Sequence, residues 1–155
     1  MIRCTVIVAC VCATAHADPQ LKSTTLMLSR ARTRPARLLA KNVDIEIVRA
    51  QTPCALRLVI EPQHTLFKRF AITVFYQVNA GGAVTSSKSP TTLDVVAVGA
   101  EPITTKHARV EIIRKKAHDF DAKLEGTFDY SSSQWTLTGT VRIEGDTCVA
   151  HSSTE

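Results

Sequence analysis

Basic side chains crowd one short segment near the start of the chain, where Arg30, Arg32, Arg34, Arg37 and Lys41 follow one another closely. Guanidinium groups form paired hydrogen bonds with phosphate and carboxylate groups. If the segment is extended, Arg30, Arg32 and Arg34 share one face, because alternate side chains of a strand point the same way. The spacing therefore predicts an anion-binding strip at these three residues and Arg37. A charged edge that prevents sheets from aggregating is the alternative.

Two cysteines outside the first 17 residues could form a disulfide. Cys54 and Cys148 are the only thiols outside the first 17 residues, because Cys4, Cys10 and Cys12 all fall within them. In an oxidising compartment one pairing is available, and closing so long a loop stabilises a fold by about 4 to 5 kcal/mol in the chain-entropy model. The sequence predicts a disulfide between Cys54 and Cys148; two separate buried thiols are the alternative.

The compartment is indicated by residues 1–17. A short positive start precedes the apolar residues 4–14, and Ala15 and Ala17 form a small-x-small cleavage signature. This pattern predicts a secretory signal peptide at 1–17 and one exported domain at 18–155, located in the periplasm or outside the cell. The apolar run is shorter than the roughly 18 residues of a membrane-spanning helix, so no transmembrane segment is predicted.

Length and charge restrict the class of protein further. The chain has 155 residues and a formal net charge of +5. What remains after cleavage suits one domain with its own core. The charge is too small for a dedicated nucleic-acid binder, so we expect no nucleic acid as partner. An anionic component of the cell envelope or another exported protein fits better.

Alternation of apolar and polar residues dominates the middle of the chain. It is regular in residues 43–47, 56–61, 71–78 and 109–112, whereas residues 93–98 are almost entirely apolar. A period of two predicts half-buried strands, and a short apolar run predicts a central strand.

The clearest single unit is a C-terminal hairpin. Its predicted inward residues are aromatic or aliphatic: Phe120, Ala122, Leu124, Phe128, Tyr130, Trp135, Leu137, Val141 and Ile143. Residues 131–134 supply a polar loop between the two strands. Gly126 and Gly139 fall in inward positions, which is typical of a kink or a close approach of two backbones.

Together these patterns predict an all-β fold, a single antiparallel β-sandwich of about seven or eight strands with one disulfide. Immunoglobulin-like topology is one option, and an open barrel is an alternative. At most one short helix is expected, at residues 35–42, where Pro35 is suited to the first helical position and Asn42 to a stop. The last residues, 150–155, are expected to form a polar tail.

Other side chains give weaker indications of chemistry. His118 lies beside Asp119 and Asp121, which would allow a surface metal site, but charged residues are expected on that outward strand face. The serines at 131–133 lack the G-x-S-x-G pattern of a hydrolase nucleophile. The hairpin aromatics could line a sugar or lipid pocket, but a core face is the simpler interpretation. We predict no catalytic residue, cofactor or metal.

The function that follows is a non-enzymatic binding or structural module at the cell envelope or outside the cell. The alternative is a carrier that holds a small apolar ligand between its sheets. A small hydrolase is a third hypothesis, because a catalytic triad assembled from distant residues leaves no local motif.

Overall fold

The computed structural model describes residues 20–48, 54–78, 84–86, 91–105, 107–116 and 119–145. These residues contain strands and turns but no helix. The strands are β1 (Gln20–Arg30), β2 (Ala36–Arg37), β3 (Ala40–Val48), β4 (Cys54–Pro62), β5 (Phe67–Val78), β6 (Val84–Ser86), β7 (Thr92–Ala97), β8 (Ile103–Thr105), β9 (Ala108–Lys116), β10 (Asp119–Tyr130) and β11 (Ser133–Glu144). The predicted all-β class is confirmed.

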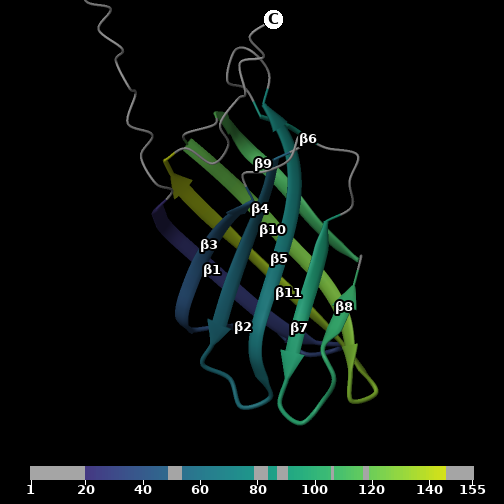
Figure 1. Cartoon of the computed structure of the whole chain (residues 1–155). Coiled ribbons are helices and arrows are strands. Elements are labelled where there is room, and N and C mark those ends of the chain that lie inside the picture. The colour runs from purple at the N-terminus through teal and green to yellow at the C-terminus, as the bar shows by residue number, and fades with distance from the viewer. Residues whose placement is uncertain are drawn as a thin grey trace, which may run out of the picture.

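The strands form two antiparallel sheets. Sheet A has the order β2-β1-β11-β10-β9, and sheet B has the order β3-β4-β5-β7-β8 with β6 paired to β5. Figure 1 shows the long strands of sheet B lying across the diagonal strands of sheet A. The result is a two-layered, β-sandwich-like fold.

Within each sheet, most strands that follow one another in the chain are neighbours; the exception is β6 and β7, which both pair with β5, and β1 pairs with β11. An immunoglobulin domain uses Greek-key connections instead, so this order gives no support to the immunoglobulin-like option. The described residues hold eleven strands, more than the seven or eight predicted. The difference comes largely from β2, β6 and β8, which have two or three residues each and are too short to show a period.

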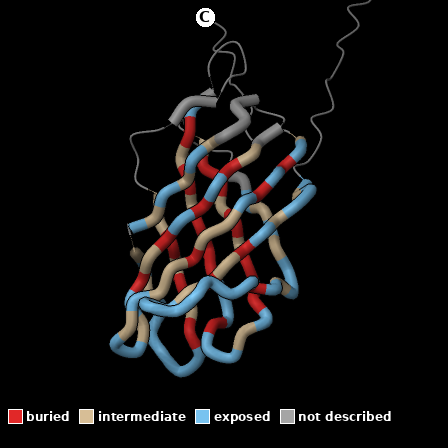
Figure 2. Tube along the Cα trace, turned by 180° about the vertical axis from the view of Figure 1, so that it is seen from behind, coloured by how far each residue is buried: buried red, intermediate tan, exposed pale blue. Residues whose placement is uncertain are grey.

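The core lies between the inner faces of the two sheets. Buried and exposed residues alternate along the strands, as Figure 2 shows. The largest fully buried side chains come from both sheets: Ile60, Phe67, Phe70, Ile72, Tyr76, Leu93, Val95, Leu137 and Ile143. Phe128 is also buried, whereas Trp135 is half-buried. The predicted inward face of the C-terminal hairpin is therefore confirmed for its described side chains.

The hairpin between β10 and β11 turns at Ser131 and Ser132, where the backbone φ angles are 51° and 58°. The turn has two residues rather than the expected loop at 131–134, because Ser133 already pairs with Tyr130. Positive φ at both positions matches the hairpin turn whose twist suits antiparallel strands.

The two inward glycines mark close approaches, as predicted. A Cβ atom on Gly126 would lie 2.6 Å from Cδ2 of Leu93 in the opposite sheet. A Cβ atom on Gly139 would lie 2.5 Å from the backbone oxygen of Thr25. Only hydrogen fits at either position.

The helix predicted at residues 35–42 is wrong, since this segment contains β2 and the start of β3. The backbone N–H of Leu38 donates to the carbonyl oxygen of Leu26 at 2.8 Å, and the Leu38 side chain is buried. Docking this leucine into the core outweighs the weak local helix preference.

Several predictions concern residues outside the described ranges: the signal peptide at 1–17, the tail at 150–155, His118 and Cys148. Cys54 begins β4, and Figure 1 shows that the start of β4 and the end of β11 lie at the same end of the molecule. The Cys54–Cys148 disulfide stays a prediction. In the described part of the chain, no helix has the length and apolarity needed to span a membrane.

Candidate anion-binding site

The predicted arginine strip lies on a tight turn. Arg30 ends β1, and its carbonyl oxygen accepts hydrogen bonds from Thr33 N at 2.9 Å and from Thr33 Oγ1 at 2.6 Å. The Arg30 N–H donates in turn to Thr33 Oγ1 at 3.1 Å. A threonine side chain that bonds the local backbone in this way favours a turn over a continuous strand.

The expected extended geometry is therefore wrong, because Arg30, Arg32 and Arg34 do not share one face of one strand. They are instead distributed around the connection from β1 to β2, and Arg37 follows in β2. All four arginines are exposed. The segment therefore presents four exposed guanidiniums within eight residues, from the end of β1 to β2.

Arg32 occupies the tip of this turn with a φ angle of 65°. This left-handed conformation favours glycine, and a residue with a Cβ atom adopts it at a cost of about 1 to 2 kcal/mol. The chain thus carries an arginine where glycine would be more stable. Strained residues of this kind gather at functional sites.

The Arg30 side chain is held in place from the neighbouring strand. Its Nε atom donates to Ser133 Oγ at 2.9 Å, which fixes the guanidinium plane. A guanidinium has five N–H donors, so the remaining four are available to another acceptor. Among the described residues, no carboxylate lies within ion-pair distance of Arg30, Arg32, Arg34 or Arg37. The positive charge of this turn is not neutralised by the described part of the protein.

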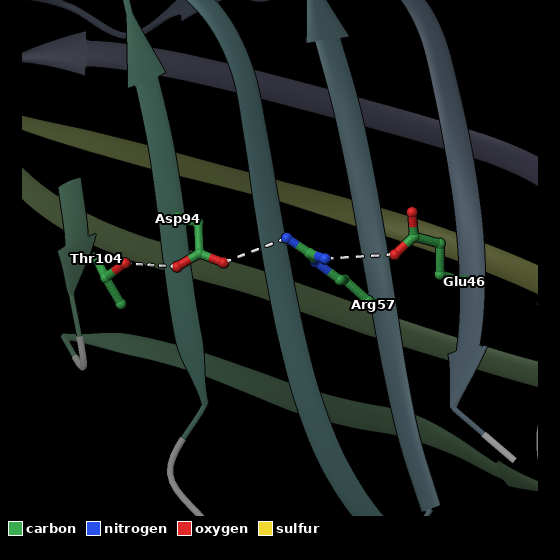
Figure 3. Close-up of polar contacts among 4 residues, drawn as sticks. All are labelled: Glu46, Arg57, Asp94 and Thr104. Carbon is green, nitrogen blue, oxygen red and sulfur yellow. Dashed lines mark hydrogen bonds and ion pairs between the residues drawn. The ribbon is translucent and has the colours of Figure 1, made fainter. Parts of the chain in front are cut away.

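Arg57 on the outer face of sheet B shows the opposite situation (Figure 3). Its guanidinium lies 3.5 Å from a carboxylate oxygen of Glu46 on one side and 3.5 Å from one of Asp94 on the other. Asp94 also accepts a hydrogen bond from Thr104 Oγ1 at 2.8 Å. This row joins β3, β4, β7 and β8, and its charges compensate one another. It is best explained as a structural feature.

An aromatic cluster packs close to Arg30, which pairs with Trp135 in the register of β1 and β11. Phe67 is its centre, with ring centroids 5.1 Å from Trp135, 5.3 Å from Tyr130 and 5.5 Å from Phe128. Three of the aromatic residues predicted for the hairpin thus pack against Phe67. The sequence pattern did not predict that Phe67 contacts them. Because Phe67 and Phe128 are buried, this cluster is a core that supports the hairpin tip.

Comparison with protein-family models, curated proteins and solved structures finds no match for the chain. No relative therefore indicates a function for this fold or this site. Function has to be inferred from the charges, hydrogen bonds and hollows of the described residues themselves.

Ser133 and His64, two residues with side chains suited to catalysis, each have a hydrogen-bond partner within the described ranges. Ser133 Oγ accepts a hydrogen bond from Arg30 Nε at 2.9 Å, and His64 Nδ1 accepts one from the backbone N–H of Leu66 at 3.1 Å. No group of three or more His, Cys, Asp or Glu side chains forms a metal-binding cluster among these residues. His118 lies outside them, so its predicted neighbourhood is not described.

The structure also contains hollows that the sequence did not indicate. One of about 10 Å³ lies between the sheets, among Leu56, Val74, Leu124 and other core residues, and has room for about one water molecule. Another of about 400 Å³ lies on the outer face of sheet A. Its charged residues are two of each sign: Arg109, Lys123, Glu111 and Glu125.

A third hollow lies where the sheets separate, between β1 and β3. It has a volume of about 340 Å³ and is lined by Leu21, Thr24, Leu26, Arg37, Leu38, Leu39, Ala40, Lys41, Asn42 and Val43. We call it the edge groove. Its residues come from both sheets, so no periodic pattern in one strand could reveal it. Two residues of the predicted basic segment, Arg37 and Lys41, belong to it.

Proposed function

We propose that this protein is a non-enzymatic binding module that attaches to an anionic component of the cell envelope or extracellular surface. The site is the turn that carries Arg30, Arg32, Arg34 and Arg37. One observation supports it above all: these exposed guanidiniums have no carboxylate partner among the described residues, whereas Arg57 has two.

The physical reason is the mutual repulsion of like charges. Several guanidiniums on one short loop repel one another, and a bound anion relieves that repulsion while forming charge-assisted hydrogen bonds. Exposed charges contribute little to folding, about 0 to 1 kcal/mol per pair. Binding should be sensitive to salt, because such charges are screened over about 10 Å at 0.1 M ionic strength.

Heparin serves as the polyanionic probe. The variant Arg30→Ser/Arg32→Ser/Arg34→Ser should elute from immobilised heparin at a lower salt concentration than the wild type, with nearly unchanged thermal stability. The matched control is Arg109→Ser/Lys123→Ser/Arg142→Ser, which removes the same charge from the outer face of sheet A. If the control elutes as early as the turn variant, only net charge matters and the site is wrong.

Arg32→Gly separates binding from stability in one substitution. Glycine relieves the left-handed strain, which should raise the free energy of unfolding by about 1 kcal/mol. The same change removes a guanidinium, so retention on heparin should fall. A purely structural role for Arg32 predicts higher stability with unchanged retention, and that result would contradict the proposal.

The carrier alternative also has one observation in its favour. The hollow between the sheets has room for about one water molecule, but the edge groove is far larger. A ligand with an apolar part would therefore lie at the edge of the sandwich rather than at its centre.

A further inference from the structure

We infer that the edge groove binds a single-chain anionic amphiphile, with its alkyl chain along the groove and its anionic headgroup at Arg37 and Lys41. The inference rests on the proposed function for the headgroup, because Arg37 belongs to both sites. It adds the class of ligand and a place for its apolar part.

The apolar lining is the first reason. Leu26 and Leu38 are buried at the base of the groove, and half-buried Leu21 and Val43 extend it along β1 and β3. Leu39 also lines the groove with 54% of its surface exposed. This exposed leucine adjoins the apolar part of a groove whose lining also contains Thr24, Arg37, Lys41 and Asn42, and it gives an alkyl chain more surface to cover.

The charge of the lining is the second reason. Among the described residues, Arg37 and Lys41 are the charged residues that line the groove, and none of those lining residues is Asp or Glu. The nearest acidic residue along β3, Asp44, accepts a hydrogen bond from Asn42 Nδ2 at 2.7 Å. A carboxylate or phosphate at the mouth of the groove would meet two lining cations, while the nearby Asp44 carboxylate is engaged by Asn42.

The dimensions are the third reason. About 340 Å³ falls near the lower end of the range for small-molecule sites, about 300 to 1,000 Å³. The small hollow between the sheets leaves no space for a chain to penetrate further. One alkyl chain fits this geometry better than a two-chain lipid.

The test is calorimetric titration of the full exported chain with octanoate, decanoate and dodecanoate, each below its critical micelle concentration. Each added methylene that is buried should tighten binding about fourfold. Decanol has the same alkyl chain without the charge, and its affinity should be lower than that of decanoate by at least about tenfold. Equal affinity for all three acids would overturn the inference, since it would leave only anion binding.

Two variants and one control assign the site. Arg37→Ser/Lys41→Ser should lower the affinity for decanoate to that for decanol and keep the dependence on chain length, whereas Arg109→Ser/Lys123→Ser should change neither. Ala40→Trp fills the groove and should abolish binding of all three acids. Unchanged decanoate binding by folded Ala40→Trp, checked by circular dichroism, would overturn the site.

The heparin and decanoate measurements fail independently. If the turn variant elutes from heparin like its control while the affinity for the acids still rises with chain length, the turn is refuted as a polyanion site and the groove is kept. Normal heparin behaviour without decanoate binding would refute the groove alone. A second copy of the chain covering the groove would appear as a dimer that Ala40→Trp dissociates, and that outcome also overturns the amphiphile.

Discussion

The two inward glycines allow a sharp test of how the sheets pack. At Gly126, an added methyl group would lie 2.6 Å from Cδ2 of Leu93, against about 3.5 to 4.0 Å for a normal carbon contact. Leu93 is fully buried, so it has to rotate within a filled core. Overpacking of this kind costs about 1 to 3 kcal/mol, and replacing a strand glycine returns about 0.5 to 1 kcal/mol. We therefore expect Gly126→Ala to destabilise the protein by about 0 to 2.5 kcal/mol.

At Gly139 the obstacle is different, because the nearest atom is the backbone oxygen of Thr25 at 2.5 Å. That oxygen belongs to β1, which is paired with β11, so the strand itself would have to shift. Gly139→Ala should therefore cost at least about 1 kcal/mol more than Gly126→Ala, since backbone cannot rotate away as a side chain can.

Urea denaturation measures both costs from the midpoint, provided that the m value is unchanged. Leu93→Ala should cost about 2 to 5 kcal/mol alone but less in the Gly126→Ala background, with a coupling energy of about 1 kcal/mol. Strict additivity would show that Leu93 is not the obstacle. Gly139→Ala as mild as Gly126→Ala would refute the close approach of β1 and β11 described here.

Three further substitutions or treatments test other parts of the fold. Ser131→Asn/Ser132→Gly should raise the free energy of unfolding by about 1 kcal/mol, because Asn-Gly suits positive φ better than two serines; unchanged thermal unfolding would contradict the turn geometry. Thr24→Val should stabilise the protein by up to about 1 to 2 kcal/mol, because Thr24 Oγ1 is buried with no hydrogen-bond partner among the described residues; destabilisation in urea would show that the hydroxyl is satisfied. Exported protein should gain two alkylatable thiols only after reduction, and two freely alkylated thiols beforehand would refute the Cys54–Cys148 disulfide.

The alternating pattern predicted the long strands well for a physical reason. β4, β5, β10 and β11 each bury one face against the opposite sheet, so their sequences must repeat every second residue. The inward glycines were recognisable for the same reason, as missing side chains on a face that is otherwise filled.

The short segments could not be predicted in this way. β2 contains only Ala36 and Arg37, and its pairing depends on where the turn before it leads. That turn is formed by the Thr33 side chain and places Arg32 at positive φ, against the usual preference for glycine. Local rules therefore favoured a strand and then a helix where the chain forms a turn and then a strand.

The candidate site was predictable in composition but not in geometry. The sequence identifies Arg30, Arg32, Arg34 and Arg37 as a basic group, and it cannot say whether carboxylates from other strands neutralise them. Arg57 looks equally isolated in the sequence, yet Glu46 and Asp94 reach it from strands on either side. Partners across strands decide which basic residues remain available for binding.

This dependence on neighbours also bears on the choice between polyanion and amphiphile. Arg30, Arg32 and Arg34 lie at the end of β1 and on the connection that follows it, whereas Arg37 and Lys41 line a partly apolar groove. A sulfated glycan has no apolar part, so it gains nothing from the groove and should engage chiefly the turn. An anionic amphiphile gains from its charge and from the apolar part of the groove, and it should depend on Arg37 and Lys41 more than on Arg32. The relative sensitivity of the two probes to Arg32→Gly and to Arg37→Ser/Lys41→Ser therefore identifies which chemistry this edge of the molecule recognises.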